Sequence, residues 1–346
     1  MKKLLLITLS LLLILSLASC GTSVGDEKTT DTDTSAKSTN EAQIDYDTEF
    51  NITVISGTTG MGFAKLMNDN KNGEALFNYN IEVVSGADVV TSAILGGDAN
   101  IAAVPTNLAA VLYQKTNGEV QVIAANTLGV LYLIENGESI SSINDLKGKT
   151  IYCCQQGANP EYITNYLLAE NGLVVGEDVT LDFTYNTPDE LTTAIASGLV
   201  NLAVLPEPKV TAALTQNQSL RRALNFSDEW ENVADGLSLV QGCLIAKKSF
   251  IDAHSAELDA FLAEYEESIN FVNENPQEAS EMIAEFGVIP KAALAFKAIP
   301  NCNIAFLAGE DMITNMMSFY DVLYAANPAS VGGAMPDRAK LFYVGK

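Results

Sequence analysis

The chain has 346 residues, of which 48% are hydrophobic, and it carries a formal net charge of −24 with one histidine. This length suits two domains of ordinary size. The acidic balance argues against nucleic-acid binding, because a phosphate backbone is bound by basic surfaces, and a single histidine cannot form a histidine pair for a metal.

The N-terminal residues have the pattern of an export signal. Two lysines precede an apolar run over residues 4–17, and the small residues Ala18 and Ser19 follow it. A run of about 14 residues is shorter than the roughly 20 that span a bilayer, and is typical of a signal peptide. We therefore predict a signal peptide over residues 1–19.

The segment after this signal predicts a tethered protein. Leu17-Ala18-Ser19-Cys20, followed by glycine, resembles the lipobox of bacterial lipoproteins, which implies acylation of Cys20. The alternatives are an ordinary signal peptide or a buried cysteine. Residues 20–47 are mostly Ser, Thr, Asp, Glu and Lys, and cannot bury enough surface to offset their ordering entropy. We expect them to form a flexible tether.

From residue 50 onwards, short β-rich runs alternate with helical patterns. In a first block, strand patterns cover 51–56, 81–84, 101–104, 120–124 and 130–134, and helical patterns cover 61–67, 89–95 and 107–113. In a second block, strand patterns cover 149–154, 181–185 and 201–205, and helical patterns cover 160–170, 188–197 and 209–214. Thr106 is placed to cap the helix at 107–113, and Thr187 and Glu190 have the spacing of a capping box.

This alternation predicts an α/β protein built from βαβ units with a mostly parallel sheet. One more strand pattern covers 240–246, after which 256–274 and 276–286 carry helical spacing and no convincing strand pattern. We expect this helical tail to return to the first domain. The chain should cross between domains near 134–139 and again near 239–242.

Four segments of the body resemble one family. Residues 142–150 resemble the entry to the second domain of periplasmic-type solute-binding proteins, and Gly157-Ala158-Asn159 resembles the loop that follows it. Residues 189–204 and Pro206-Glu207-Pro208 resemble two later motifs of that family. Taken together, the order and spacing of these four segments over residues 51–271 resemble one branch of this family, the nitrate/sulfonate/taurine and thiamine-precursor (NMT1-like) binding proteins. The family often has Asp where Asn201 stands, so we assign that position no role.

The resemblance implies a type II periplasmic-binding-protein (Venus-flytrap) fold with two crossing strands and a ligand between two lobes. Lobe I would comprise 48–135 and 243–346, and lobe II 136–242. It also implies a monomer without cofactor, lipid-anchored on the extracytoplasmic face, that delivers its ligand to the permease of an ABC importer. Sulfonates, pyrimidine- or flavin-like rings and nitrate-like anions are the candidate ligands.

The residues themselves point to the same site. In open parallel sheets, ligands bind beyond the carboxyl ends of strands, where helix N-termini gather. Three loops at such positions, 56–59, 105–107 and 156–159, are rich in glycine, hydroxyl and amide groups. The candidate ligand-binding residues are Ser56, Thr58, Thr59, Thr106, Asn107, Gln156, Gly157, Asn159 and Glu207.

Several candidates have a structural alternative. Thr106 is equally well explained as a helix cap, and a role for Glu207 in spacing the crossing is favoured over ligand contact. Tyr132 and Tyr162 fit the core better than a stacking role. The three loops lack arginine, so no guanidinium clamp on an anion is evident, although helix N-termini can also hold an anion.

The sequence offers little support for catalysis, and we predict no catalytic residue and no metal site. A Ser-His-Asp triad would have to recruit His254 from the helical tail. The alternatives are a thiamine-pyrimidine-synthase-like enzyme, which would need a histidine and a lysine at the cleft, and a ligand-sensing surface protein. Cys153 and Cys154 are adjacent in a strand and should point to opposite faces. Cys243 and Cys302 are expected to be buried thiols rather than a disulfide.

Overall fold

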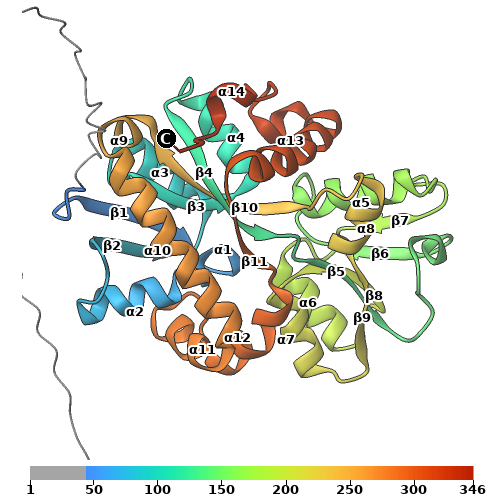
Figure 1. Cartoon of the computed structure of the whole chain (residues 1–346). Helices are drawn as coiled ribbons and strands as arrows, with labels where there is room; N and C mark the ends of the chain where they lie inside the picture. Colours follow the sequence, from blue (N-terminus) through green and yellow to red (C-terminus); the bar gives the residue numbers. More distant parts are fainter. Residues whose placement is uncertain (1–43, 346) are drawn as a thin grey trace, which may run out of the picture. The chain divides into compact units, whose positions relative to one another are not determined.

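The structure is a computed structural model that describes residues 44–345. Two β-sheets organise these residues (Figure 1). The six-stranded sheet has the order β11 (Ile304–Leu307), β4 (Val120–Leu128), β10 (Val240–Lys247), β3 (Ile101–Pro105), β1 (Glu49–Ile55) and β2 (Asn78–Val84). The five-stranded sheet has the order β7 (Thr180–Asp182), β6 (Thr150–Cys153), β8 (Leu202–Pro206), β5 (Leu131–Asn136) and β9 (Leu220–Asn225).

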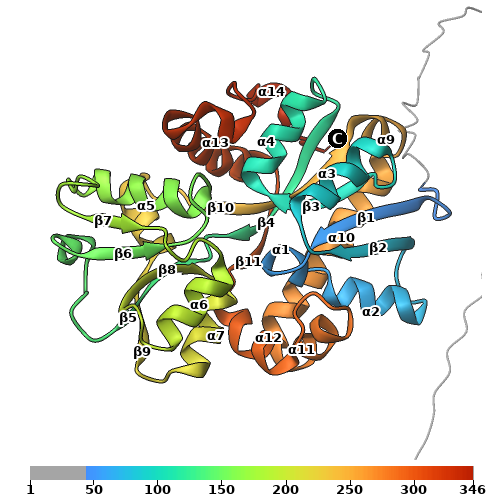
Figure 2. The ribbon, with the colours of Figure 1, turned by 180° about the vertical axis from the view of Figure 1, so that it is seen from behind.

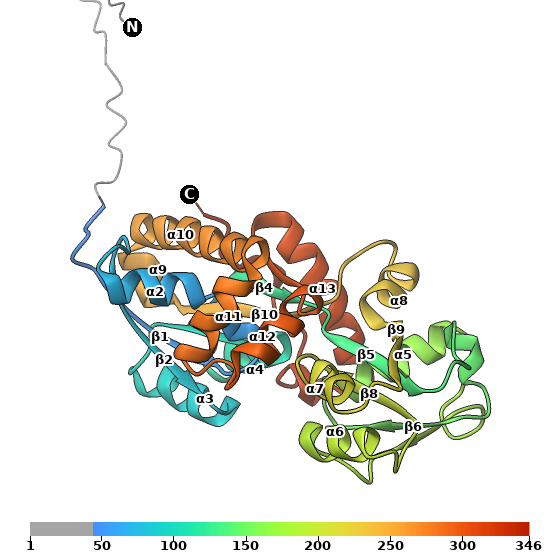
Figure 3. The same ribbon diagram turned by 90° about the horizontal axis from the view of Figure 1, so that it is seen from below.

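Helices cover both faces of the six-stranded sheet, and together they form lobe I. One face packs against α2 (Ala64–Asn72), α10 (Ser255–Glu274), α11 (Pro276–Glu285) and α12 (Ala292–Ala298), of which Figure 3 shows α11 and α12 in front of the strands. The other face packs against α3 (Ala87–Gly96), α4 (Thr106–Lys115) and α13 (Gly309–Ala326). Alternate residues of the central strands therefore enter two different cores, as a pleated strand requires.

Four helices surround the five-stranded sheet and complete lobe II. They are α5 (Asn159–Glu170), α6 (Pro188–Ala196), α7 (Lys209–Gln216) and α8 (Phe226–Val233). The predicted capping box is confirmed, since Thr187 Oγ1 accepts a hydrogen bond from the Glu190 amide while Glu190 Oε2 accepts one from the Thr187 amide. Shorter helices are α1 (Thr58–Met61), α9 (Lys248–Ala253) and α14 (Arg338–Leu341).

The sheets are mixed, so the expectation of a mostly parallel sheet is wrong in this respect. The parallel pairs are β1 with β2 and β3, and β6 with β7 and β8. Strands β4, β5 and β10, next to the connections between lobes, pair antiparallel with their neighbours. Each lobe thus has a parallel part, from which the loops toward the other lobe emerge, and an antiparallel part near the connections (Figure 2).

The chain first changes sheet at Gly129 and Val130, between β4 and β5, rather than at 134–139. It returns just before β10, so the predicted lobe boundaries at 135 and 242 fall inside β5 and β10. The sequence separated the strand patterns at 120–124 and 130–134, but it did not indicate that the two strands join different sheets. β11 was missed because it follows a long helical segment.

The last residues of the predicted tether contact the body. Ile44 packs against the core of lobe I, and the Asp45 amide donates to Glu257 Oε1 at 2.8 Å. The predicted signal peptide, Cys20 and residues 20–43 lie outside the described residues. Within residues 44–345, no helix is both long enough and apolar enough to cross a membrane.

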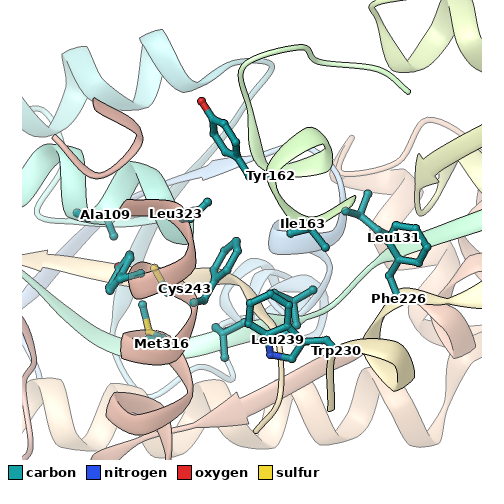
Figure 4. Packing of buried hydrophobic residues seen from close by; sticks show 14 of the residues in the cluster. Ala109, Leu131, Tyr162, Ile163, Phe226, Trp230, Leu239, Cys243, Met316 and Leu323 are labelled. Atoms are coloured by element: carbon teal, nitrogen blue, oxygen red, sulfur yellow. The ribbon is translucent and has the colours of Figure 1, made fainter. Parts of the chain in front are cut away.

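One hydrophobic cluster extends across both lobes (Figure 4). Ala109 and Met316 of lobe I belong to it together with Ile163 and Trp230 of lobe II. The Trp230 ring lies 5.6 Å from Phe319 of α13, edge to face. Helix α13, near the end of the chain, therefore packs against α5, and its Phe319 contacts Trp230 of α8 in the other lobe.

Candidate functional site

The first turns of α4 and α5 meet across the lobes. Helix α4 begins directly after β3, and α5 begins after β6, so both lie beyond the carboxyl ends of parallel strands. Asn159 Nδ2 donates to Asn107 Oδ1 at 3.2 Å. Asn159 Oδ1 is buried and has no hydrogen-bond partner within the described residues. The structure thus brings together two of the predicted residues and leaves one polar atom between the lobes unpaired.

The loop before α5 uses much of its hydrogen-bonding capacity within its own lobe. The Gln156 amide donates to Asn186 Oδ1 at 2.8 Å, and the Gly157 amide donates to Glu161 Oε2 at 2.6 Å. Tyr162 Oη donates to the Gly157 carbonyl at 2.8 Å. Gly157 has φ +78°, which explains the glycine. A ligand here would meet the side chains of this loop more readily than the Gly157 amide.

The loop after β1 lies against the crossing strands. The Ser56 amide donates a hydrogen bond to the Val84 carbonyl at 2.8 Å. Ser56 is exposed, whereas Thr58 and Thr59 are half-buried. Asn126 Nδ2 donates to the Thr59 carbonyl at 2.9 Å. Thr59 is therefore held by lobe I, and Ser56 faces solvent.

Two polar residues of β4 were missed by the sequence analysis. Asn126 and Thr127 are each 1% exposed, and Thr127 Oγ1 donates to Asn126 Oδ1 at 3.1 Å. Asn126 Nδ2 also approaches Tyr265 Oη at 3.0 Å. The available signal was an Asn-Thr pair at the end of an otherwise apolar strand. Buried polar pairs at such a position hold neighbouring elements together.

Thr106 does not cap α4, so that structural alternative is wrong. Pro105 occupies the N-cap position, and no side chain caps the helix. Thr106 is fully buried, its Oγ1 donates to the Val240 carbonyl at 2.8 Å, and its own carbonyl accepts from Tyr320 Oη at 2.9 Å. Its hydroxyl therefore joins α4 to β10 and does not point to solvent.

Glu207 lies in a buried network of lobe II. Its side chain forms an ion pair with Arg222 and accepts from the Thr211 amide at 3.1 Å. Burial raises the pKa of Glu207, and Arg222 opposes that shift. These contacts agree with the structural role that the sequence favoured. The three candidate loops lack arginine, but Arg222 of β9 lies beside this candidate residue.

Tyr132 connects this network to lobe I. The Arg222 guanidinium lies over the Tyr132 ring at 5.4 Å from its centre, and Tyr132 Oη donates to the Asn301 carbonyl at 3.0 Å. Burial is the main reason that the pKa of Tyr132 rises to about 12. Tyr162 makes a similar connection, since its Oη accepts from Asn327 Nδ2 at 3.0 Å. Both tyrosines are mostly buried and join the lobes, as their predicted core role allows.

The reactive side chains are held in inert positions. Cys153, Cys154, Cys243 and Cys302 are buried and are not in disulfides. Cys153 and Cys154 belong to separate hydrophobic clusters, which confirms their opposite orientation. Burial raises the pKa of Cys154 to about 11 and that of the others further, so these thiols stay protonated at neutral pH. Within residues 44–345, no group of three or more His, Cys, Asp and Glu could hold a metal.

Comparison with known proteins identifies the family. The model of the NMT1/THI5-like family matches residues 80–279, more than half of the chain. A search of curated proteins gave no match. Among solved structures, an ABC transporter protein from Parabacteroides distasonis is 25% identical, with a TM-score of 0.71 over 86% of this chain and 99% of that chain.

Two further structures have the same fold. The periplasmic aliphatic sulphonate binding protein SsuA from Escherichia coli is 15% identical, with a TM-score of 0.67 over 86% of this chain and 92% of that chain. The periplasmic nitrate-binding protein NrtA from Synechocystis is 12% identical, with a TM-score of 0.54 over 84% and 85% of the two chains. The predicted two-lobed fold and the predicted branch are confirmed. This chain belongs to the NMT1/THI5-like family.

Proposed function

We propose that this chain is a solute-binding protein that captures a small organic solute or anion between its lobes and delivers it to the permease of an ABC importer. Membership of the NMT1/THI5-like family and the similarity to transporter binding proteins support this role. The observation that carries it is the contact between Asn159 and Asn107, with Asn159 Oδ1 buried and unpaired. An unpaired buried acceptor costs about 1–3 kcal/mol, which a donor on a ligand would recover.

The ligand would meet amide and hydroxyl groups rather than a free cation. We expect contacts from Thr58, Asn107, Gln156 and Asn159 and from the first turns of α4 and α5. The first turns of α4 and α5 contain no lysine or arginine, so an anion here would be held by N–H groups, which helix N-termini provide. Sulfonates, pyrimidine- or flavin-like rings and nitrate-like anions remain the candidates, and the sulphonate- and nitrate-binding proteins of the same fold support including anions.

A thermal-shift screen over these three compound classes tests the proposal. The protein without its first 20 residues should bind one compound in one-to-one stoichiometry. At a ligand concentration of 100 times Kd, mass action stabilises the native state by about 2.7 kcal/mol, which raises the melting temperature measurably. Failure of all three classes to raise the melting temperature would count against the importer role.

We also propose that Cys20 is acylated and holds a monomer at the extracytoplasmic face of the membrane. The lipobox-like tetrad at residues 17–20 supports this part of the proposal. Labelled palmitate should enter the wild-type chain and not Cys20→Ser, and the variant should leave the membrane fraction. Equal membrane retention of the two chains would contradict the anchor.

Solute binding is favoured over catalysis because the single histidine lies far from the place where the two lobes meet. His254 ends α9, and its ring packs 5.0 Å from the ring of Phe250. Figures 1 and 2 place α9 at the end of lobe I that faces away from the five-stranded sheet. A thiamine-pyrimidine-synthase-like reaction needs a histidine where the lobes meet, so we propose that the chain is not an enzyme.

A further inference from the structure

A second polar pocket lies at the boundary of the lobes, apart from the candidate ligand site. Its volume is about 210 Å³. Its lining residues are Thr211, Leu214, Thr215, Gln218, Arg222 and Lys297. Lys297 belongs to α12 of lobe I, whereas the others belong to lobe II, and α7 and α12 lie side by side there (Figure 3). The pocket thus combines cationic side chains from both lobes.

Arg222 is held in a fixed position in this pocket. Its Nη2 forms the ion pair with Glu207 and donates to Thr211 Oγ1 at 2.9 Å, and its guanidinium stacks over Tyr132. A guanidinium has five N–H donors, and both of these contacts use Nη2, so donors remain for another acceptor. The Arg222 side chain is 27% exposed, which leaves part of it accessible from the pocket.

Lys297 supplies a second positive charge without a carboxylate partner. It is exposed on α12, and within residues 44–345 its ammonium is in none of the ion pairs. Glu207 already neutralises Arg222, so the pocket has a surplus of one positive charge. This surplus stands out in a chain whose net charge is −24.

We propose that this pocket binds a small oxyanion, such as sulfate, phosphate or a carboxylate. The anion would accept hydrogen bonds from Arg222 and Lys297, and the Thr215 hydroxyl and the Gln218 amide provide further donors. Because the two cations belong to different lobes, a bound anion stabilises the arrangement of the lobes described above. The anion is a regulator of that arrangement and not the transported solute, so this inference does not depend on the proposed function.

The test uses inorganic sulfate and a matched pair of lysine variants. Sulfate replaces chloride at constant ionic strength, with no other ligand present, and the melting temperature is followed. Lys291, the exposed residue just before α12, does not line the pocket and serves as the control. Sulfate should raise the melting temperature of the wild type and of Lys291→Gln. For Lys297→Gln its apparent affinity should fall about tenfold or more, because a charge-assisted hydrogen bond is lost.

A third variant, Asn159→Ala, shows whether sulfate binds at the candidate ligand site instead. It should keep the sulfate response. The proposal is wrong if Lys297→Gln responds like the wild type, or if both lysine variants weaken binding equally, which would indicate a general charge effect. It is also wrong if Asn159→Ala loses the response, because sulfate would then occupy the site between α4 and α5.

Discussion

Thr106 and Asn159 show how two polar residues at helix starts acquire different tasks. Both follow a parallel strand, and both were candidates for ligand contact. The Thr106 hydroxyl is completely buried and donates to Val240, whereas the Asn159 amide reaches the other lobe and retains an unpaired oxygen. Spacing along the chain cannot distinguish these cases, because the partner of each residue comes from a distant segment.

Substitutions at these two residues should therefore affect different properties, ligand affinity at Asn159 and stability at Thr106. Asn159→Ala removes a ligand contact, so affinity should fall roughly ten- to a hundredfold while the melting temperature of the free protein changes by only a few degrees. Thr106→Val removes the buried hydrogen bond to the Val240 carbonyl, so the free energy of unfolding should fall by about 1–3 kcal/mol with affinity unchanged. Calorimetric titration and urea unfolding measure the two quantities. Thr106→Ser, which keeps the hydroxyl, is the control, and normal binding by Asn159→Ala would show that the ligand binds elsewhere.

Glu135 should make stability depend on pH in the acid range. Burial acts to raise the pKa of its carboxyl, but hydrogen bonds from Ser139 and from the Ile140 amide, together with Arg221, lower it below the ordinary 4.5. The native state therefore binds fewer protons than the unfolded state. The stabilisation is fully present above pH 4.5 and is lost as pH falls through the lower native pKa.

The variant Glu135→Gln tests this dependence. At pH 7 it should unfold more easily than the wild type by about 1.5–3 kcal/mol, because it loses hydrogen bonds to a charged acceptor. Urea unfolding from pH 7 to pH 3 should show the difference shrinking below pH 4.5. Glu138→Gln, at a neighbouring exposed carboxylate, is the control. A difference between Glu135→Gln and wild type that stays constant with pH would contradict the explanation.

At the scale of elements, β10 can pass close to α1 and β4 because it has a glycine at the contact. A Cβ at Gly242 would lie 2.5 Å from Thr59 Cγ2 and 2.9 Å from both Asn126 Oδ1 and Thr127 Cβ. These distances are too short for ordinary contact. Gly242→Ala should therefore displace α1 or β4 and lower the free energy of unfolding by about 1–3 kcal/mol, as overpacking does.

Gly96→Ala is a matched control for this prediction. Gly96 ends α3, and its added Cβ would meet only Asp98 Oδ2, at an ordinary 3.6 Å. Alanine is the better helix residue by up to about 1 kcal/mol, so this variant should be neutral or slightly stabilised. Urea unfolding measures the free energy of unfolding of both variants. Equal stabilities would mean that the contact at Gly242 relaxes without cost.

The elements that the sequence predicted well have local causes. The capping box at Thr187 and Glu190 depends on residues three apart, and the alternating strands of each lobe depend on their own apolar pattern. The sequence missed β9, because Arg221 and Arg222 interrupt its apolar pattern and their partners, Glu135 of β5 and Glu207 just after β8, lie in distant segments. The change of sheet at Gly129 was also hidden, since only strand pairing reveals it.

Much of the candidate site depends in the same way on distant contacts. The family resemblance and the loop compositions predicted Asn107 and Asn159, which the structure brings together. Neither the resemblance nor the loop compositions could indicate that Thr106 donates a hydrogen bond to Val240, or that Asn126 donates one to Thr59. These contacts join residues 134 and 67 positions apart, beyond any local pattern.

At the scale of the whole described body, the two lobes share more than their connecting strands. Helix α13 belongs to lobe I but packs on α5 and contacts α8 of lobe II, so one hydrophobic cluster continues from lobe to lobe. Hydrogen bonds from Tyr132 to Asn301, from Asn327 to Tyr162, and between the two asparagines of the candidate site also join the lobes. A hinge movement that opens the site must change some of these contacts.

Trp230 is placed to report such a movement. It is the only tryptophan of the chain, it is fully buried, and its ring lies between Tyr166 of lobe II at 4.9 Å and Phe319 of lobe I at 5.6 Å. If ligand binding closes the lobes, the packing of Phe319 against the buried Trp230 ring should change, so the emission of Trp230 should change while X-ray scattering shows a smaller radius of gyration. Phe319→Leu, which keeps the site apolar but removes the facing ring, should show the same change in scattering with an altered emission response. An unchanged radius of gyration upon saturating ligand would mean that the lobes stay in the arrangement described here and that the ligand enters without a hinge movement.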